Sequence, residues 1–354
     1  MRILHIADFG KYGNLNGVGE AVLHLAKSQE QIGVNVIVAY TRPNPYIKNP
    51  ICVFADKKQI FKRLINEYKP DIAVFHSFYD FKHPRFASIL KNKHIPYLIT
   101  FHGGASRTNY LRKRLVKAIA NELIFKPYIR SAAATIYLNE SERRSSIFMQ
   151  LDSHKSMILP NGISKPNKTH SFKPDENIVI SFISRLDYHG KGIDILLKAI
   201  SSIEDELLKL KVKFAFYGYD YKDGTVKQIN STSNICEYLG YVSSIEKENA
   251  FLGTDIVILP SRSEGMPVSI LEALSYGIPC IVTPQTNVAD IIEKYNCGWV
   301  ANLTVTEIAS AILRAAEELN DNCNMLKDNA IRASSDYLWE VIAQKSIGLY
   351  EKII

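Results

Sequence analysis

The sequence predicts an α/β fold made of two doubly wound domains, and three observations lead to this prediction. The chain has 354 residues, more than a single hydrophobic core usually organises. Short β-rich runs alternate with helical patterns in both halves, which is typical of parallel sheets covered by helices. A polar stretch with two prolines, SKPNKTHSFKPDEN at residues 164–177, separates the halves.

The order of the expected elements follows from these patterns. In the first half we expect strands at 2–7, 34–40, 71–76, 97–101, 133–138 and 155–159, and helices at 17–33, 60–68 and 86–92. In the second half we expect strands at 178–184, 212–217, 238–239, 256–259 and 279–283, and helices at 193–203, from 267 to about 277, at 306–319 and at 329–354.

These elements predict four parts of the chain. They are an N-terminal domain at 1–165, a linker at 166–177, a C-terminal domain at 178–335, and a helix at 336–354 that crosses back to the first domain. The cleft between two such domains, at the carboxyl ends of their strands, is the expected ligand site.

Composition narrows the class of protein. Hydrophobic residues make up 46% and charged residues 22% of the chain, which is normal for a globular protein. The five cysteines are scattered, which favours neither a disulfide framework nor a zinc site and predicts a cytoplasmic protein. The first residues form an expected strand rather than a signal peptide, and no apolar run is long enough to span a membrane.

The most specific motif lies at residues 258–283, with the sequence ILPSRSEGMPVSILEALSYGIPCIVT. An apolar strand leads into a turn that carries Glu264 and Gly265, and Pro267 then stands near a helix start. The free amides of such a helix start bind anions and hydroxyl groups, and Glu272 can reach back from the first turn. The alternative is that Glu264 is a surface acid and Glu272 only caps the helix.

A second motif, SRLDYHGKGIDILLKAI, covers residues 184–200. A strand end presents Arg185, and Lys191 follows a turn just before the next helix. Two cations that converge with a helix dipole suit a diphosphate group, although both could also be solvated surface charges. His189 in the same loop is expected to be exposed rather than catalytic.

Three weaker motifs lie in the first half. A glycine-rich loop with Asn16 and Gly17 links the first strand to the first helix, and it could equally be a turn that binds nothing. The run TFHGG places His102 at a strand end, where it could also be an ordinary hydrogen-bonded residue. The run PNGI at 160–163 is a turn, and His5, His24, His76, His83 and His94 are expected to be structural or on the surface.

Together these motifs resemble those of retaining GT-B glycosyltransferases, in particular glycosyltransferase family 4, the group 1 enzymes with an E-x7-E signature. Glu264 and Glu272 match its two acids, and the resemblance is stronger at 178–283 than before residue 170. It implies a retaining hexosyltransferase that moves a sugar from a UDP- or GDP-linked donor to a saccharide or lipid-linked saccharide in bacterial surface polysaccharide or glycolipid assembly. Asn16 departs from the glycine pair that the family usually has at this loop.

The resemblance also implies roles for single residues. Glu272 would accept hydrogen bonds from the ribose hydroxyls, and Glu264 and His102 would lie near the donor sugar. Arg185 and Lys191 would hold the diphosphate and stabilise its departure, which makes His102, Glu264, Arg185 and Lys191 the expected catalytic residues. The expected donor contacts comprise Asn16, Gly17, Arg185, Lys191, Gly218, Tyr241, Val242, Glu264, Gly265, Met266, Pro267, Val268, Leu271 and Glu272.

Other classes of protein share parts of this pattern. A Rossmann dehydrogenase needs a G-x-G-x-x-G spacing that residues 10–19 lack. A sugar-nucleotide epimerase, a glucan synthase, or a non-catalytic protein that binds nucleotide-sugars or nucleic acid would share parts of the pattern. No aromatic and basic motif indicates nucleic acid, and we expect neither a metal ion nor a cofactor.

One region is strongly basic. Residues 82–130 hold eleven Lys or Arg and a single acid, Glu122, within a chain of net charge +7. In the stretch 110–125 the apolar residues fall on one helical face beside Arg112, Lys113, Arg114 and Lys117. This pattern suits a helix that lies on an anionic membrane, so 107–130 is an expected contact with the inner face of the plasma membrane; the alternative is a helix packed on the core.

Overall fold

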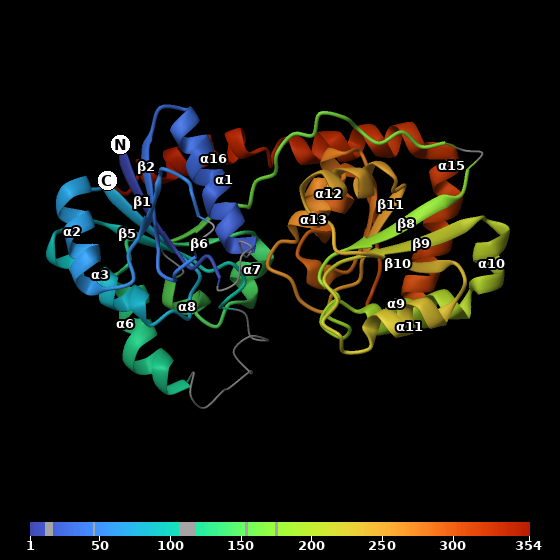
Figure 1. Ribbon diagram of the computed structural model, residues 1–354, viewed down its shortest axis with the longest axis horizontal. Coiled ribbons are helices and arrows are strands. Elements are labelled where there is room, and N and C mark those ends of the chain that lie inside the picture. Colours follow the sequence, from blue (N-terminus) through green and yellow to red (C-terminus); the bar gives the residue numbers. More distant parts are fainter. Residues whose placement is uncertain (11–16, 45–46, 106–117, 153–154, 174–175) are drawn as a thin grey trace. The chain divides into compact units, whose positions relative to one another are not determined.

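The computed structural model describes residues 1–10, 17–44, 47–105, 118–152, 155–173 and 176–354. These residues divide into two compact units. Unit 1 comprises Met1–Gly162 and Trp339–Ile354, and unit 2 comprises Ile163–Leu338. Each unit contains a fully parallel sheet with helices on both faces, so the predicted doubly wound α/β fold is confirmed (Figure 1).

Unit 1 is organised around a seven-stranded sheet with the order β3-β2-β1-β4-β5-β6-β7. Its strands are β1 (Arg2–Ala7), β2 (Asn35–Tyr40), β3 (Cys52–Phe54), β4 (Ile72–His76), β5 (Tyr97–Thr100), β6 (Ala134–Tyr137) and β7 (Ser156–Ile158). Its helices are α1 (Gly17–Gln31), α2 (Lys58–Tyr68), α3 (Lys82–Asn92), the π-helix η1 (Asn121–Phe125), α6 (Lys126–Ser131), α7 (Glu140–Ser145), α8 (Met149–Asp152) and α16 (Trp339–Tyr350).

Two hydrophobic clusters hold the helices of unit 1 on its sheet. On one face the sheet packs against α2, α3 and α6, with Phe61, Phe86 and Ile129 buried. On the other face α1 and α16 lie side by side, and Val22 of α1 and Ile342 of α16 are fully or almost fully buried (Figure 1). The last helix of the chain therefore completes the core of the first unit.

Unit 2 has a six-stranded sheet with the order β10-β9-β8-β11-β12-β13. Its strands are β8 (Ile178–Ile183), β9 (Val212–Tyr217), β10 (Cys236–Gly240), β11 (Ile256–Leu259), β12 (Cys280–Val282) and β13 (Gly298–Val300). Its helices are α9 (Ile193–Ser202), α10 (Glu204–Lys209), α11 (Thr225–Thr232), α12 (Ser244–Leu252), α13 (Val268–Ser275), the 3₁₀-helix η2 (Pro284–Thr286), α14 (Ala289–Tyr295) and α15 (Val305–Ser335).

Some elements differ from the expectation. The helical stretches expected at 306–319 and 329–354 are divided differently, because α15 runs without interruption from Val305 to Ser335 and α16 begins only at Trp339. The polar residues 320–328 stay helical because Leu326 and the alanines on either side keep one face of α15 buried. The elements that the sequence did not predict comprise the short strands β3 and β13 and the helices α6, α7, α8, α10, α11, α12, η2 and α14.

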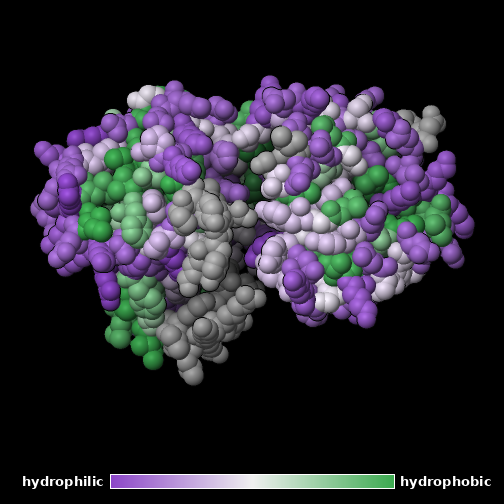
Figure 2. Space-filling view, viewed as in Figure 1, coloured by the Kyte–Doolittle hydropathy of each residue, from purple (hydrophilic) through white to green (hydrophobic). Residues whose placement is uncertain are grey.

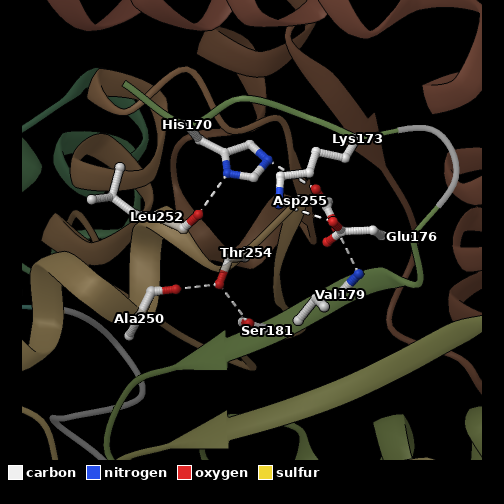
Figure 3. Close-up of polar contacts among 9 residues, drawn as sticks. All are labelled: His170, Lys173, Glu176, Val179, Ser181, Ala250, Leu252, Thr254 and Asp255. Carbon is white, nitrogen blue, oxygen red and sulfur yellow. Dashed lines mark hydrogen bonds and ion pairs between the residues drawn. The ribbon is translucent and has the colours of Figure 1, made fainter. Parts of the chain in front are cut away.

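The polar segment at 163–173 runs along unit 2 and is held by His170 (Figure 3). Nδ1 of His170 lies 2.9 Å from the carbonyl oxygen of Leu252, and Nε2 lies 2.8 Å from Oδ1 of Asp255. The second oxygen of Asp255 accepts the backbone N–H of Val179 at the start of β8, at 2.8 Å. One carboxylate thus joins this segment to the first strand of the sheet.

Candidate active site

The order of strands in unit 2 places two polar loops next to each other. On one side of β8 lie β9 and then β10, which follow it in sequence. On its other side lies β11, so the strand order reverses at β8. The carboxyl ends of β8 and β11 therefore form a topological switch point, where ligands bind in open α/β sheets. The loop after β8 carries Arg185 and Lys191, and the loop after β11 carries Glu264.

The structure brings the two predicted motifs into direct contact at this point. Nζ of Lys191 donates a hydrogen bond to Oε1 of Glu264 at 2.5 Å, and the hydroxyl of Ser261 donates to the same oxygen at 2.6 Å. The side chains of Lys191 and Glu264 are only 9% and 13% exposed. A buried cation beside a largely buried anion offers both a partner for a phosphate and an acceptor for a hydroxyl group.

The Glu264 turn is held by residues that the sequence did not single out. The backbone N–H of Glu264 donates to the carbonyl of Gln285 at 3.1 Å, and Nδ2 of Asn287 donates to the carbonyl of Glu264 at 2.6 Å. Thr283 donates to the carbonyl of Ser261 at 2.8 Å. The polar run TPQTN after β12 was the available signal, since such residues form hydrogen-bonded turns.

Close backbone packing joins the Lys191 loop to β11. A Cβ on Gly192 would lie 1.9 Å from the carbonyl oxygen of Pro260, so only glycine fits there. Arg262 bridges the loops as well, with two hydrogen bonds of 2.7 and 2.8 Å to the carboxylate of Asp194 in α9. The position of Lys191 relative to Glu264 is therefore fixed by the backbone and by a bidentate ion pair.

The helix start expected near Pro267 is α13, which begins at Val268 with Pro267 as its N-terminal cap. The first amides of a helix have no partner within the helix, which makes this end suitable for an anion. Gly265 and Val268 are partly exposed, whereas the side chains of Met266 and Pro267 are buried, so any contact from these two would come from the backbone. Leu271 is fully buried, and its side chain therefore belongs to the core.

Glu272 lies in the first turns of α13 and has a partner that the sequence did not indicate. Nζ of Lys247, in α12, lies 2.6 Å from Oε2 and 2.7 Å from Oε1 of Glu272. The two side chains are 34% and 26% exposed, so solvent reaches both. Glu272 is thus a partly exposed side chain whose Oε2 atom is buried and whose charge is balanced by a lysine from the neighbouring helix.

The remaining predicted residues of unit 2 lie at its strand ends. Arg185 follows β8 and is exposed, and it forms no ion pair with any residue that the structure describes. A Cβ on Gly218 would lie 1.9 Å from the carbonyl of Ser184, which keeps the end of β9 against the Arg185 loop. Tyr241 is exposed and Val242 is partly exposed just after β10. His189 is exposed, as expected.

In unit 1, His102 follows β5 in a strained backbone conformation. Its φ is +48°, in the left-handed region that few residues other than glycine adopt. The next amide, of Gly103, donates to Oε1 of Glu142 at 2.5 Å, and the other carboxylate oxygen of Glu142 accepts the amide of Leu138 at 2.6 Å. Burial raises the pKa of Glu142, and these two amides oppose that rise.

The imidazole of His102 contacts another histidine. Its Nε2 lies 3.1 Å from Nδ1 of His76 at the end of β4, and burial lowers the pKa of His102 to about 4. A small cavity of about 20 Å³ lies beside the two rings and is also lined by Thr100, Asn161 and Trp339. Asn16 lies outside the described residues, and Gly17 is the exposed first residue of α1.

No group of three or more potential metal-ligating side chains occurs within the described ranges. In the same part of the chain no helix is long and apolar enough to cross a bilayer. The expectation that the reaction needs no metal stays a prediction.

Two Rossmann-like units with parallel sheets and polar loops at the strand ends define the GT-B class of fold. A solved structure of the Anabaena protein Alr3699/HepE in complex with UDP-glucose has the same fold, with a TM-score of 0.75 and 17% identity. The match covers 99% of this chain and 100% of that one.

The family follows from the sequence comparisons. Residues 164–333 match the family model described as Glycosyl transferases group 1, and residues 15–165 match the one described as Glycosyltransferase Family 4. The chain therefore belongs to the group 1, family 4 glycosyltransferases, and the resemblance noted in its motifs is confirmed.

Two relatives illustrate the family. The glycosyltransferase TuaC of Bacillus subtilis (strain 168), whose name assigns it provisionally to teichuronic acid biosynthesis, is 24% identical over 90% of each chain. The N,N'-diacetylbacillosaminyl-diphospho-undecaprenol alpha-1,3-N-acetylgalactosaminyltransferase of Campylobacter jejuni is 25% identical over 69% of this chain and 66% of that protein.

Proposed function

We propose that this glycosyltransferase moves a hexose from a nucleotide-sugar donor to a saccharide or lipid-linked saccharide, with retention of the donor's α-configuration. The observation that carries the proposal is the buried contact among Lys191, Glu264 and Ser261 at the switch point of unit 2. A cation for a phosphate and a carboxylate for sugar hydroxyls lie there within one hydrogen bond of each other. The start of α13 and Glu272 follow on the same loop and helix.

The proposed roles follow from the chemistry of each group. Lys191 and the exposed Arg185 hold the diphosphate, and Glu272 accepts hydrogen bonds from the ribose hydroxyls, with Lys247 balancing its charge. Glu264 orients the sugar, and the amides at the start of α13 bind its hydroxyls or the phosphate. The backbone near Tyr241 and Val242 contacts the base, and His102 of unit 1 contacts the sugar.

The proposed reaction exchanges one bond at the anomeric carbon for another. The bond from this carbon to the diphosphate oxygen breaks, and the acceptor hydroxyl oxygen forms a new bond to the same face. The hydroxyl proton passes to the departing diphosphate, so the products are a nucleoside diphosphate and an α-glycoside. Arg185 and Lys191 stabilise the negative charge that develops on the diphosphate, and no protein nucleophile or metal ion takes part.

Similar proteins support the choice of substrates. The HepE structure is a complex with UDP-glucose, which favours a UDP-sugar donor here. The Campylobacter relative is named for an undecaprenol diphosphate saccharide acceptor, and TuaC for a surface polysaccharide. Both favour an acceptor in bacterial polysaccharide or glycolipid assembly.

Donor binding is tested by thermal shift with UDP-, GDP- and ADP-sugars. The right donor at 100 times its Kd stabilises the protein by about 2.7 kcal/mol, and Glu272→Ala and Arg185→Ala lose most of this shift. Glu293→Ala and Lys198→Ala, which remove exposed charges elsewhere on unit 2, keep it. If no donor raises the Tm, or if Glu272→Ala responds as the wild type does, the proposed site is wrong.

Retention is tested by the configuration of the product. With an α-linked donor and a saccharide acceptor, NMR of the anomeric proton should show an α-linkage in the first product formed. A β-linkage would disprove the proposed mechanism. Binding of a donor without transfer to any acceptor would instead assign a binding protein.

We also propose that unit 1 contacts an anionic bilayer through the segment around η1. Ile119 and Leu123 are 64% and 73% exposed, and Phe81 is 51% exposed beside Phe125 of η1. Figure 2 shows hydrophobic surface over the part of unit 1 that holds α6. Lys126 and Arg130 follow directly in α6, so apolar and basic side chains occur together, as in interfacial helices.

Sedimentation with vesicles that contain anionic lipid tests this contact. The wild type should bind at low salt, and the double variant Ile119→Ser/Leu123→Ser should lose at least half of the bound fraction. Leu208→Ser, which removes an equally large exposed side chain from α10 of unit 2, serves as the control. Equal binding by the double variant and the wild type would rule the surface out.

A further inference from the structure

A chain of polar side chains crosses the core of unit 1 and ends at His102. It begins in the C-terminal helix α16 and passes through α1, β1 and β4. Its consecutive members contact each other at 2.8 to 3.1 Å, and four of them are at most 2% exposed. In order, they are Ser346, Gln29, His5, His76 and His102.

The end in α16 gives the chain a direction. The hydroxyl of Ser346 donates to the carbonyl of Ala343 at 2.6 Å, so its oxygen is left to accept. Nε2 of Gln29 donates to that oxygen at 2.8 Å, and Oε1 of Gln29 therefore faces Nε2 of His5 at 2.8 Å as an acceptor. An amide oxygen can only accept, so His5 carries its proton on Nε2.

The same argument fixes the tautomer of each following histidine. With its proton on Nε2, a neutral His5 has a lone pair on Nδ1, and this nitrogen accepts from Nε2 of His76 at 2.8 Å. Nδ1 of His76 then accepts from Nε2 of His102 at 3.1 Å. His102 is left with its proton on Nε2 and a lone pair on Nδ1.

We propose that Gln29, His5 and His76 are positioning residues that hold His102 in the Nε2–H tautomer, so that its Nδ1 accepts a hydrogen bond from a hydroxyl group of the bound sugar. The proposal rests on the proposed function for the presence of a sugar at His102. It assigns no proton transfer to His102. His102 is instead a fixed hydrogen-bond acceptor, and its Nδ1 favours a ligand that presents a hydroxyl group there.

The surroundings of the chain keep its rings neutral, as the proposal requires. Burial lowers the pKa of His5 to about 4, an effect that the contact with Gln29 opposes, and burial also lowers the pKa of His76 well below its usual value. A second proton on either ring would place two N–H groups opposite each other within the chain. Neutral rings can form every one of these hydrogen bonds at once. For a given orientation of Gln29, only one assignment of donor and acceptor nitrogens allows this.

The backbone at the outer end also restricts His102. The left-handed conformation at His102 and the hydrogen bond from Gly103 to Glu142 fix the backbone position from which the imidazole ring extends. The contact with His76 then fixes how the ring is turned. The backbone of His102 and its contact with His76 leave Nδ1 as the ring nitrogen that makes no hydrogen bond within this row of side chains.

The tautomer can be measured without any activity. Protein labelled with ¹⁵N-histidine is studied by long-range ¹H–¹⁵N correlation at pH 7, and His102→Gln identifies the signals of this residue. We expect a protonated Nε2 and an unprotonated Nδ1 in the wild type. A protonated Nδ1, or a mixture of both tautomers, would overturn the proposal even if the enzyme transfers sugar as proposed.

Variants at the buried end test the positioning. Gln29→Leu removes the acceptor for His5, and we expect mixed tautomers at His102. The loss of one directed hydrogen bond predicts a fall in kcat/KM of about ten-fold, with the Kd for free nucleoside diphosphate unchanged. Gln29→Glu keeps an acceptor for His5 in either protonation state, so it should restore both the tautomer and most of the rate.

A control separates positioning from general loss of stability. Thr135→Val removes a buried hydrogen bond of 2.8 Å to Asp152 in the same unit, away from the chain, and should keep the wild-type tautomer and rate. If Gln29→Leu folds and leaves the tautomer of His102 unchanged, the chain does not position this residue. If it fails to fold, the wild-type spectrum alone decides. Absence of transfer with every donor would refute the proposed function and leave the tautomer result intact.

Discussion

At the scale of single residues, Lys191 and Glu264 form a largely buried ion pair in the site proposed for the donor. Each charge is removed from most of its water, and each is compensated by the other, while Ser261 donates a further hydrogen bond to Glu264. Losing one member leaves an unpaired buried charge, which costs far more than the intact pair contributes. Close backbone packing at Gly192 and the hydrogen bond from the Asn287 side chain to the Glu264 carbonyl fix the positions of the two residues.

This predicts a non-additive pair of variants. Lys191→Met should destabilise unit 2 by about 3–5 kcal/mol, because it leaves Glu264 buried and charged. The double variant Lys191→Met/Glu264→Gln should recover most of that loss, since no isolated charge remains, yet it should not regain donor binding. Urea unfolding followed on all three proteins measures the coupling. Additive losses in the double variant would show that the two charges do not depend on each other.

The residues that could be predicted from the sequence are those that follow a strand end or a helix start. Glu264, Glu272, Arg185 and Lys191 all lie in such local patterns. Lys247 and Asn287 could not be predicted, because they reach the site from other elements and their contacts exist only once the sheet has formed. The histidine pair of His76 and His102 was missed for the same reason, since neighbouring parallel strands bring the two together.

At the scale of elements, the segment at 163–173 has no regular secondary structure and depends on His170. Both nitrogens of the ring contact oxygen atoms, one from Leu252 and one from Asp255 (Figure 3). The exposed ion pair between Lys173 and Glu176 in the same stretch is 69% and 65% exposed. Exposed pairs of this kind contribute little, so the buried contact anchors the segment.

Replacing His170 should therefore loosen this segment. His170→Leu keeps a similar volume but leaves Asp255 without one partner, and we expect unit 2 to lose about 1–3 kcal/mol. Hydrogen–deuterium exchange should rise at residues 163–173 more than elsewhere in the unit. Lys173→Ala is the matched control and should change neither quantity measurably. If both variants behave alike, His170 is not the anchor.

Most strands were predictable, and several short elements were not. The strands β1, β9 and β11 agree with the expectation at both ends, and the three-residue strands β7 and β12 lie within expected strands. The strands β3 and β13, which also have three residues each, were missed because so few residues show no alternation in the sequence. The continuous helix α15 was missed in its middle, because the turn facing solvent there is polar and only packing on the rest of unit 2 keeps it helical.

At the scale of the whole molecule, the two units differ in how they respond to acid. Burial lowers the pKa of five described histidines, and all lie in unit 1: His5, His24, His76, His83 and His102. A histidine whose pKa is lowered on folding binds its proton more readily when unfolded. Its contribution to stability is therefore present at neutral pH and is lost as the pH falls from 6.5 toward the folded value.

Unit 1 should thus open before unit 2 as the pH is lowered. For His5 alone, with a folded pKa of about 4 against 6.5, the loss at pH 5 is about 2 kcal/mol. Burial raises the pKa of Glu142 and Asp152, which opposes the effect in part, but the histidines outnumber them. Hydrogen–deuterium exchange at pH 7, 6 and 5, corrected for intrinsic rates, measures the order in which the two units unfold. His94→Gln, at an exposed position, should leave this order and the exchange rates unchanged. If unit 2 unfolds at a higher pH than unit 1, the buried histidines do not set the response to acid.

The helix α16 has a consequence for the order in which the chain can fold during synthesis. Unit 2 is one continuous stretch and leaves the ribosome whole, whereas unit 1 must wait for residues 339–354. Until then, the face of its sheet that Trp339, Ile342 and Tyr350 cover stays open to water. The half of the protein that is made first is therefore the half that is finished last, and its nascent sheet is the surface that a chaperone would bind.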